Sequence, residues 1–146
     1  MPRSPLSAEN TVIGAINHTA HVMTEEVRTK VSALDTIGRL RRVRNRYDDH
    51  NLDDVSWELL LELLRAEHSQ QRLSVSALTI SIPGVSATTS LRRIGELTTG
   101  GYVDRTPDAS DGRRDFVSLT MKARRLLADY LASIDSCLAE PEAHRL

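Results

Sequence analysis

The chain has 146 residues, of which 40% are hydrophobic and 27% charged, and its net charge is −1. These values fit one soluble globular domain, and the near-neutral charge excludes a nucleic-acid coat that is basic throughout. The lone cysteine, Cys137, excludes an internal disulfide and favours a reducing cytoplasm. No apolar run approaches about 18 residues and no apolar signal segment opens the chain, so we expect a cytoplasmic protein that does not span a membrane.

The N-terminal third predicts a flexible arm followed by a helical region. Residues 1–9 hold two prolines and little hydrophobicity, which is typical of a loose arm. Residues 10–50 show apolar side chains at three- and four-residue steps, which predicts helix as far as about Tyr47. We expect a break near Thr24 that separates a first short helix from the rest. The stripe comprises Val27, Val31, Leu34, Ile37, Leu40, Val43 and Tyr47.

Three further helices are expected within residues 51–99. Asp53 or Asp54 can cap a helix that runs to about Glu67, and Ser74 or Ser76 can open a short one that Pro83 and Gly84 end. Ser86 can then cap a longer helix that Gly100 and Gly101 stop. The side chains expected to face the core are Trp57, Leu60, Leu61, Leu64, Leu91, Ile94 and Leu97.

A β-hairpin and a last helix complete the chain. Residues 102–106 and 116–119 alternate in polarity around a polar loop, which predicts two paired strands. Thr120 can cap a helix to about Cys137, within a C-terminal region of residues 120–146. Three helices followed by a hairpin is the order of a winged helix-turn-helix, here residues 51–119. The expected fold class is therefore mainly α (α+β), with helical regions on both sides.

The helix that begins at Ser86 has the chemistry for reading DNA. Its first turns are short and polar, so the backbone can approach a duplex closely while hydroxyls bond phosphates and base edges. Arginines in the hairpin loop can reach a neighbouring minor groove. The candidate DNA-binding residues are Ser86, Thr88, Thr89, Ser90, Arg92, Arg93, Asp111, Arg113 and Arg114.

Residues 85–113, VSATTSLRRIGELTTGGYVDRTPDASDGR, resemble the recognition helix and wing of the multiple-antibiotic-resistance regulator (MarR) family. The wing signature, D-x-R followed by L-T, is matched by Asp111-x-Arg113 and Leu119-Thr120, and residues 73–82 are similar to the elements before the recognition helix. The resemblance implies that Arg113 enters the minor groove while a salt bridge from Asp111 orients it. Ser86, Thr88, Thr89 and Arg92 would then lie at the major groove, and Arg114 on a phosphate.

The same resemblance implies a homodimer that binds double-stranded DNA at a pseudo-palindromic operator, as a bacterial repressor. Dimerisation would fall to residues 10–47 and 120–138. A small lipophilic or phenolic effector is a further implied partner, and neither a cofactor nor a metal is expected.

Other clusters allow more than one interpretation. Arg39, Arg42 and Arg46 share a helix face that can touch phosphates, face solvent or pair with a partner's acids. His18 and His21 have a spacing that can hold a metal, but a solvated pair is the better interpretation without a third ligand. Cys137 can be an oxidation sensor or an inert thiol, and Trp57 belongs to the core.

No catalytic constellation is present, so an enzyme is not expected. An alternative function is a winged-helix module that binds protein rather than DNA. The near-neutral charge favours this alternative, as does Pro83, which resembles a one-residue insertion before the recognition helix.

Overall fold

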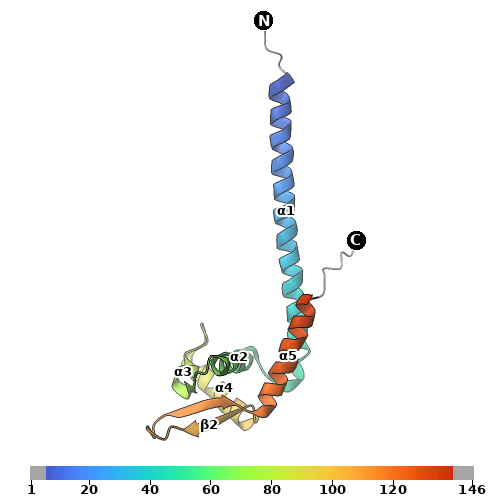
Figure 1. Cartoon of the computed structure of the whole chain (residues 1–146). Helices are drawn as coiled ribbons and strands as arrows, with labels where there is room; N and C mark the ends of the chain where they lie inside the picture. Colours follow the sequence, from blue (N-terminus) through green and yellow to red (C-terminus); the bar gives the residue numbers. More distant parts are fainter. Residues whose placement is uncertain (1–5, 140–146) are drawn as a thin grey trace.

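The computed structural model describes residues 6–139, without the side chains of residues 6–12 and Asp49. Its longest element is the helix α1 (Leu6–Asn45), which projects far beyond the rest of the chain (Figure 1). The other elements are η1 (Asp48–His50), α2 (Asp54–His68), β1 (Leu73–Ser74), α3 (Val75–Thr79), α4 (Ala87–Thr99), β2 (Val103–Pro107), β3 (Asp115–Leu119) and α5 (Met121–Ala139). The expected order of helices and hairpin is therefore confirmed.

The expected break near Thr24 is wrong, because α1 is one continuous helix. The Thr24 hydroxyl donates to the carbonyl of Ala20 one turn earlier, so its polar side chain is satisfied within the helix. Ion pairs one turn apart follow it, from Arg28 to Glu25 and from Lys30 to Glu26. The helix also begins at Leu6, so residues 6–9 of the expected arm are helical, and residues 1–5 lie outside the described chain.

The helix caps follow the sequence closely. The Asp53 carboxylate accepts from the amide of Ser56 at 2.9 Å, and Ser74 and Ser86 accept from amides in the first turns of α3 and α4. Asn51 ends η1 with a φ of 53°, and Gly101 follows α4 with a φ of 73°. The Thr120 hydroxyl caps α5 by accepting from the amide of Ala123 at 3.3 Å. All of these ends except Asn51 were predicted from a polar residue or a glycine at that position.

The core lies where α2, α4 and α5 pack against a small sheet. Trp57, Leu60, Ile94 and Leu97 are buried as expected. On α2 the fully buried leucines also include Leu59 and Leu63, whereas Leu61 and Leu64 are only partly buried. Burying aliphatic side chains of this size contributes about 1.5–3 kcal/mol each, so this cluster is the main source of stability for the domain.

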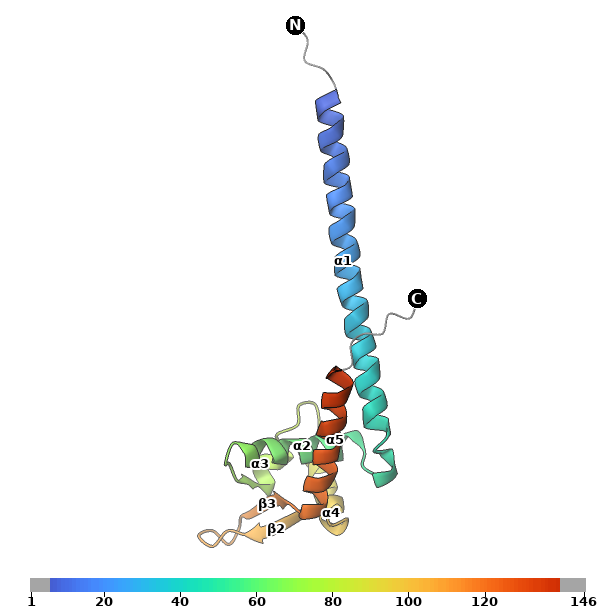
Figure 2. The same ribbon diagram turned by 45° about the vertical axis from the view of Figure 1, so that its right-hand side comes forward.

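The sheet has three antiparallel strands in the order β1-β3-β2. Strands β2 and β3 form the predicted hairpin, with Val103 opposite Leu119 and Pro107 opposite Asp115. Val117 and Leu119 of β3 are buried and alternate with half-buried residues, and Val103 is the buried residue of β2, which places one face of the hairpin on the core. The hairpin loop extends past the domain as a wing, visible at the lower left of Figure 2.

Helix α5 returns from the hairpin to lie beside the C-terminal end of α1, in both views. Tyr47, just after α1, fastens the two together: its hydroxyl lies 2.9 Å from Ser133 Oγ, and its ring stacks edge-on against Tyr130. The winged domain is therefore held at one end of the long α1 rod.

Candidate nucleic-acid interface

The start of α4 presents small polar side chains on a fixed helix end. Ser86 is the N-cap, and its Oγ accepts from the Thr89 amide at 3.2 Å and lies 2.9 Å from Thr89 Oγ1. Thr88 is exposed, and Arg92 is exposed one turn later on the same face. Gly84, with a φ of 76°, forms the turn that leads into this end. The exposed face of α4 thus carries a hydroxyl and a guanidinium at adjacent turns.

Ser90 is not available to DNA, so its prediction as a DNA contact is wrong. Its side chain is 0% exposed, and its hydroxyl has no hydrogen-bond partner in the described chain. Ser90, Ile94 and Leu97 follow the steps of four and three that define the inward face of a helix. Leu91, expected in the core, lies off that face and is 49% exposed.

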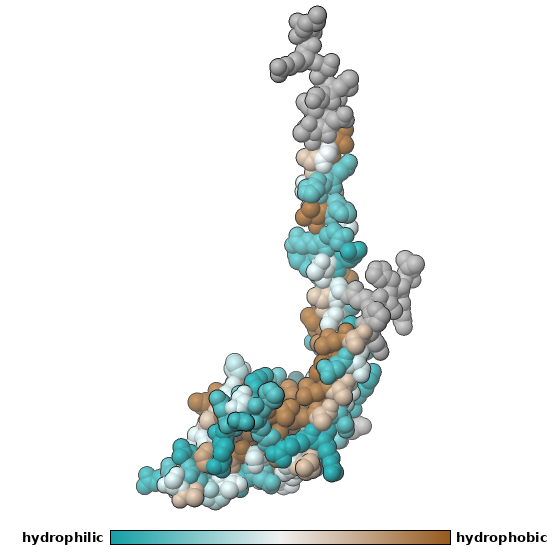
Figure 3. Space-filling view, in the orientation of Figure 1, coloured by the Kyte–Doolittle hydropathy of each residue, from teal (hydrophilic) through white to brown (hydrophobic). Residues whose placement is uncertain are grey.

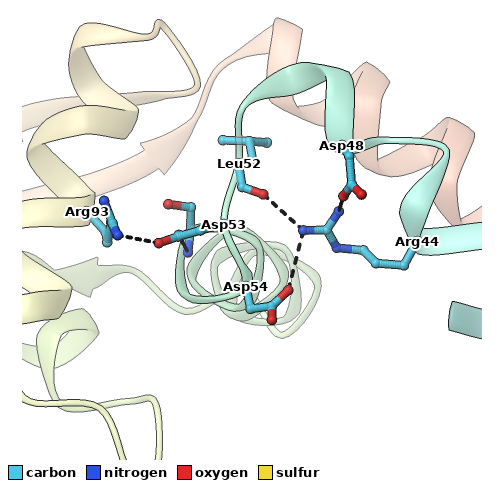
Figure 4. Close-up of polar contacts among 7 residues, drawn as sticks. Arg44, Asp48, Leu52, Asp53, Asp54 and Arg93 are labelled. Carbon is cyan, nitrogen blue, oxygen red and sulfur yellow. Dashed lines mark hydrogen bonds and ion pairs between the residues drawn. The ribbon is translucent and has the colours of Figure 1, made fainter.

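The two arginines of α4 differ in their environments. Arg93 Nη2 lies 2.5 Å from Asp53 Oδ2 (Figure 4). Arg93 Nη1 lies 2.6 Å from Glu96 Oε2, so both ends of this guanidinium are engaged within the domain. The hydrogen bond to Glu96 is the main reason that the pKa of Arg93 is raised. Arg92 has no ion pair in the described chain. Of the two predicted contacts, Arg92 is exposed to solvent, whereas Arg93 links α4 to the start of α2 through Asp53.

Asp53 has a second role that the sequence did not reveal. Its partial burial opposes ionisation, but hydrogen bonds from Ser56 and the charges of Arg93 and Arg92 outweigh burial and lower its pKa. The carboxylate thus caps α2 and holds α4 at once. The sequence signal was confined to the cap, because nothing in the spacing of residues 53 and 93 indicates contact.

The wing loop is organised by Asp108 rather than by the expected Asp111–Arg113 salt bridge. Asp108 accepts from the amide and hydroxyl of Ser110, and its Oδ2 lies 2.6 Å from Arg114 Nη2. These contacts lower the pKa of Asp108 to about 2, with the amide of Ser110 the largest cause. The backbone closes the loop, since the Asp108 amide donates to the carbonyl of Arg114 at 2.8 Å.

Asp111 and Arg113 meet through the backbone instead. Asp111 Oδ1 accepts from the Arg113 amide at 3.1 Å, and no ion pair between their side chains occurs in the described chain. Arg113 is exposed at the loop and Arg114 is engaged by Asp108. Arg113 is therefore the arginine of the wing whose side chain forms no ion pair within the described chain. Asp111 stabilises the turn that carries it.

The wing and α4 lie at the same end of the molecule, opposite the N-terminal end of α1, in Figures 1 and 2. Arg92 of α4 and Arg113 of the wing loop, both exposed, therefore belong to the elements at this end of the molecule. A helix with a polar exposed face beside an arginine-bearing hairpin is the geometry that fits a major groove and its neighbouring minor groove.

The other arginine cluster lies away from this end. Arg39 and Arg42 of α1, together with Arg46 just after it, line a cavity of about 350 Å³ with Ser133, Ser136 and Cys137 of α5. Cys137 is buried. The arginines that line the cavity beside it lie far from Cys137 in the sequence. The spacing within α1 predicted the shared face, but only the packing of α5 shows that this face is turned to another helix.

Arg44 joins the end of α1 to the start of α2. Its guanidinium lies 3.0 Å from Asp48 Oδ1 and 3.7 Å from Asp54 Oδ1 and donates to the carbonyl of Leu52 (Figure 4). It also lies over the Trp57 ring, 4.3 Å from the ring centroid. Trp57 itself is buried, as expected for a core residue.

The remaining candidates contribute no site. His18 and His21 are exposed, and no group of three metal-binding side chains is found among the described residues. Within the same residues, no helix combines the length and hydropathy needed to cross a bilayer. A second cavity, of about 320 Å³, lies between α2 and the sheet and is edged by the Arg124–Glu67 ion pair.

The fold is shared with solved structures of transcriptional regulators. A regulator of Thermotoga maritima, Tm0710, is 17% identical, with a TM-score of 0.60 over 75% of this chain and 73% of that one. MepR of S. aureus, solved in a complex with DNA, is 15% identical, with a TM-score of 0.60 over 75% of this chain and 84% of that one. YusO of Bacillus subtilis is 16% identical, with a TM-score of 0.61 over 82% and 81%.

Neither a protein-family model nor a curated protein sequence matches the chain. The likeness thus rests on three-dimensional structure at low identity, which establishes the fold. It agrees with the wing signature and the order of elements found in the sequence. The chain has the winged-helix fold of these solved structures.

Proposed function

We propose that the protein is a transcription regulator that binds double-stranded DNA as a homodimer, with α4 in the major groove and the wing in the adjacent minor groove. The observation that carries the proposal is the division of the arginines at this end of the molecule. Arg93 and Arg114 are held by Asp53 and Asp108, whereas Arg92 and Arg113 are exposed without an ion pair in the described chain.

The paired arginines stabilise the protein's own structure, whereas the exposed arginines are free to contact DNA. Paired arginines fix the angle of α4 and the shape of the wing, so little conformational entropy remains to be lost when DNA binds. The exposed pair supplies the cations that phosphates and base edges accept. Ser86, Thr88 and Thr89 complete the proposed major-groove contacts, with Asp111 as a positioning residue.

Selection from randomised duplex DNA tests this proposal directly. Purified wild type and an Arg92→Ala variant are each taken through rounds of binding, recovery and sequencing. We expect wild type to enrich a pseudo-palindromic motif that the variant enriches weakly, and we expect binding to fall steeply with added salt. A folded protein that enriches no motif, and that retains a defined protein partner instead, would favour a winged-helix interaction module.

Repression and a response to an effector are finer parts of the proposal. MepR has also been solved with ethidium bromide bound, which motivates a search for lipophilic or phenolic ligands here. A thermal-shift series with such compounds, followed by DNA binding in the presence of any that raise the melting temperature, tests this part. Loss of DNA binding on ligand addition is the outcome that a cytoplasmic repressor with an effector predicts.

A further inference from the structure

Aliphatic side chains are exposed along the part of α1 that projects in Figure 1, and Figure 3 shows some of them as separate brown patches. They are 50 to 65% exposed, although side chains of these types are usually buried. We name this set the α1 seam. It comprises Ile13, Ile16, Met23, Val27, Val31, Leu34 and Ile37.

The seam repeats every seven residues. Ile13, Ala20, Val27 and Leu34 form one series, and a second series three residues later comprises Ile16, Met23, Lys30 and Ile37. Two interleaved series of this kind average 3.5 residues per repeat, which is the pattern of a coiled coil. Val31, one turn after Val27, flanks the two series, whereas Val22, also 50% exposed, lies away from both.

The other elements among the described residues leave the seam uncovered. Val43 is buried where α1 meets α5, and it shares a cavity with Ser133 and Cys137 of α5. Val43 follows Leu34 by nine residues, which is two and a half helical turns, so the two side chains leave opposite sides of α1. Helix α5 therefore packs on the face of α1 that is turned away from the seam.

We propose that the α1 seam packs against the same seam of a second copy, as a parallel two-stranded coiled coil. A two-fold axis makes one seam complementary to another, since each residue then meets its own counterpart. Burial of these side chains would remove roughly 700 Å² from each copy, close to the about 800 Å² per partner of a standard stable interface.

The parallel orientation rests on the proposed function. Parallel helices put both winged domains at the same end of the rod, where α4 and the wing of each can face one duplex. Antiparallel helices would put the domains at opposite ends. The interface also differs from one built jointly by both terminal regions, because α5 lies on the other face of α1.

Lys30 is the one charged side chain in the two series from Ile13 to Ile37. Its Nζ lies 2.6 Å from Glu26 Oε1, which draws the ammonium to the flank of the seam where water can reach it. A single polar residue at such a position fixes register and strand number at some cost in affinity. Lys30→Leu is therefore expected to lower the dissociation constant of the dimer.

Mass measurement on the full chain, by light scattering or sedimentation over a range of concentrations, is the first test. Val27→Glu should raise the dissociation constant about a hundredfold or more, because two facing carboxylates would be buried. Val22→Glu is the matched control and should leave the dimer intact. A monomeric wild type, or a dimer lost with Leu131→Glu of α5 but kept with Val27→Glu, would overturn the proposal. Circular dichroism and Trp57 fluorescence show whether each variant is folded.

Cross-linking tests the orientation. In a Cys137→Ser background, Ile13→Cys should form a disulfide between copies under mild oxidation, since parallel helices bring the two residues 13 together. Antiparallel pairing over residues 13–37 would hold them about 36 Å apart. Absence of the cross-link in a dimer that Val27→Glu dissociates would overturn the parallel arrangement.

Neither experiment contains DNA, so the two proposals fail separately. A coiled-coil dimer that selects no DNA sequence contradicts the proposed function alone. A protein that selects DNA but shows no α1-dependent dimer contradicts the coiled coil alone.

Discussion

Arg93 of α4 lies 2.5 Å from the carboxylate of Asp53, the residue that caps α2. The next residue, Asp54, lies 3.7 Å from Arg44 at the end of α1. Two consecutive acids therefore join the helix proposed to read DNA to the helix proposed to dimerise (Figure 4). These contacts place polar links from both α1 and α4 on the first residues of α2.

Substitution of Asp53 separates its two roles. Asp53→Ala removes both the cap and the ion pair, and we expect a loss of about 1 kcal/mol in the free energy of unfolding, chiefly from the cap. The ion pair is half exposed and contributes little. Asp53→Asn keeps an oxygen for the Ser56 amide, so it should cost less in stability while still releasing Arg93. Urea unfolding of both variants measures the difference, and equal losses would contradict this division.

The buried hydroxyl of Ser90 is expected to be dispensable. Ser90→Ala removes a buried group that has no hydrogen-bond partner, so the free energy of unfolding should stay the same or rise by about 1 kcal/mol. Thr79→Val is the matched control, because Thr79 is also buried but donates to the carbonyl of Ser76 at 2.8 Å. That variant should lose about 1 kcal/mol. Thermal denaturation compares the two, and a clear loss in Ser90→Ala would show that its hydroxyl is satisfied.

DNA affinity should depend on Arg113 more than on its neighbours in the hairpin. Arg113→Ala is expected to cost about 1–3 kcal/mol of binding free energy on the selected operator. Arg105→Ala provides a control, because Arg105 is already paired with Asp115 across the strands at 3.0 Å. Fluorescence anisotropy with a labelled duplex measures both. An unchanged affinity for Arg113→Ala would refute the wing contact.

The wing should keep its order well into acid. The pKa of Asp108 is lowered from 3.8 to about 2 by the Ser110 amide, the Ser110 hydroxyl and Arg114, so its contribution is complete above about pH 4 and is lost as the pH falls through 2. A carboxyl-detected NMR titration should give a midpoint near 2 for Asp108. Ser110→Ala removes one of the bonds and should raise that midpoint. A wild-type midpoint near 3.8 would mean that the loop is not closed in solution.

Local signals located most elements of the fold correctly. Asp53, Ser74, Ser86 and Thr120 begin helices because a side-chain oxygen can satisfy a backbone amide within three residues. The alternating polarity of residues 102–106 and 116–119 likewise predicted the hairpin, whose strands pair over 103–107 and 115–119. Interactions of this range depend only on residues close together in the sequence, so the sequence alone can predict them.

The errors arose where a residue's environment depends on distant neighbours. The four-residue step from Ser90 to Ile94 placed Ser90 inside and Leu91 outside, although side-chain type predicted the reverse. Local helical bonding held α1 together through Thr24, where no glycine or proline interrupts it.

The sequence by itself determined the order of the elements, their ends and the wing signature, because caps, turns and periodicity act over a few residues. The tertiary structure decided which arginines form ion pairs within the domain and which are exposed. Asp53 and Arg93 are 40 positions apart, and their contact exists only once α2 and α4 have packed on a common core. The docking of α5 likewise selected which face of α1 remains open, since burial is a property of the packed elements and not of either helix alone.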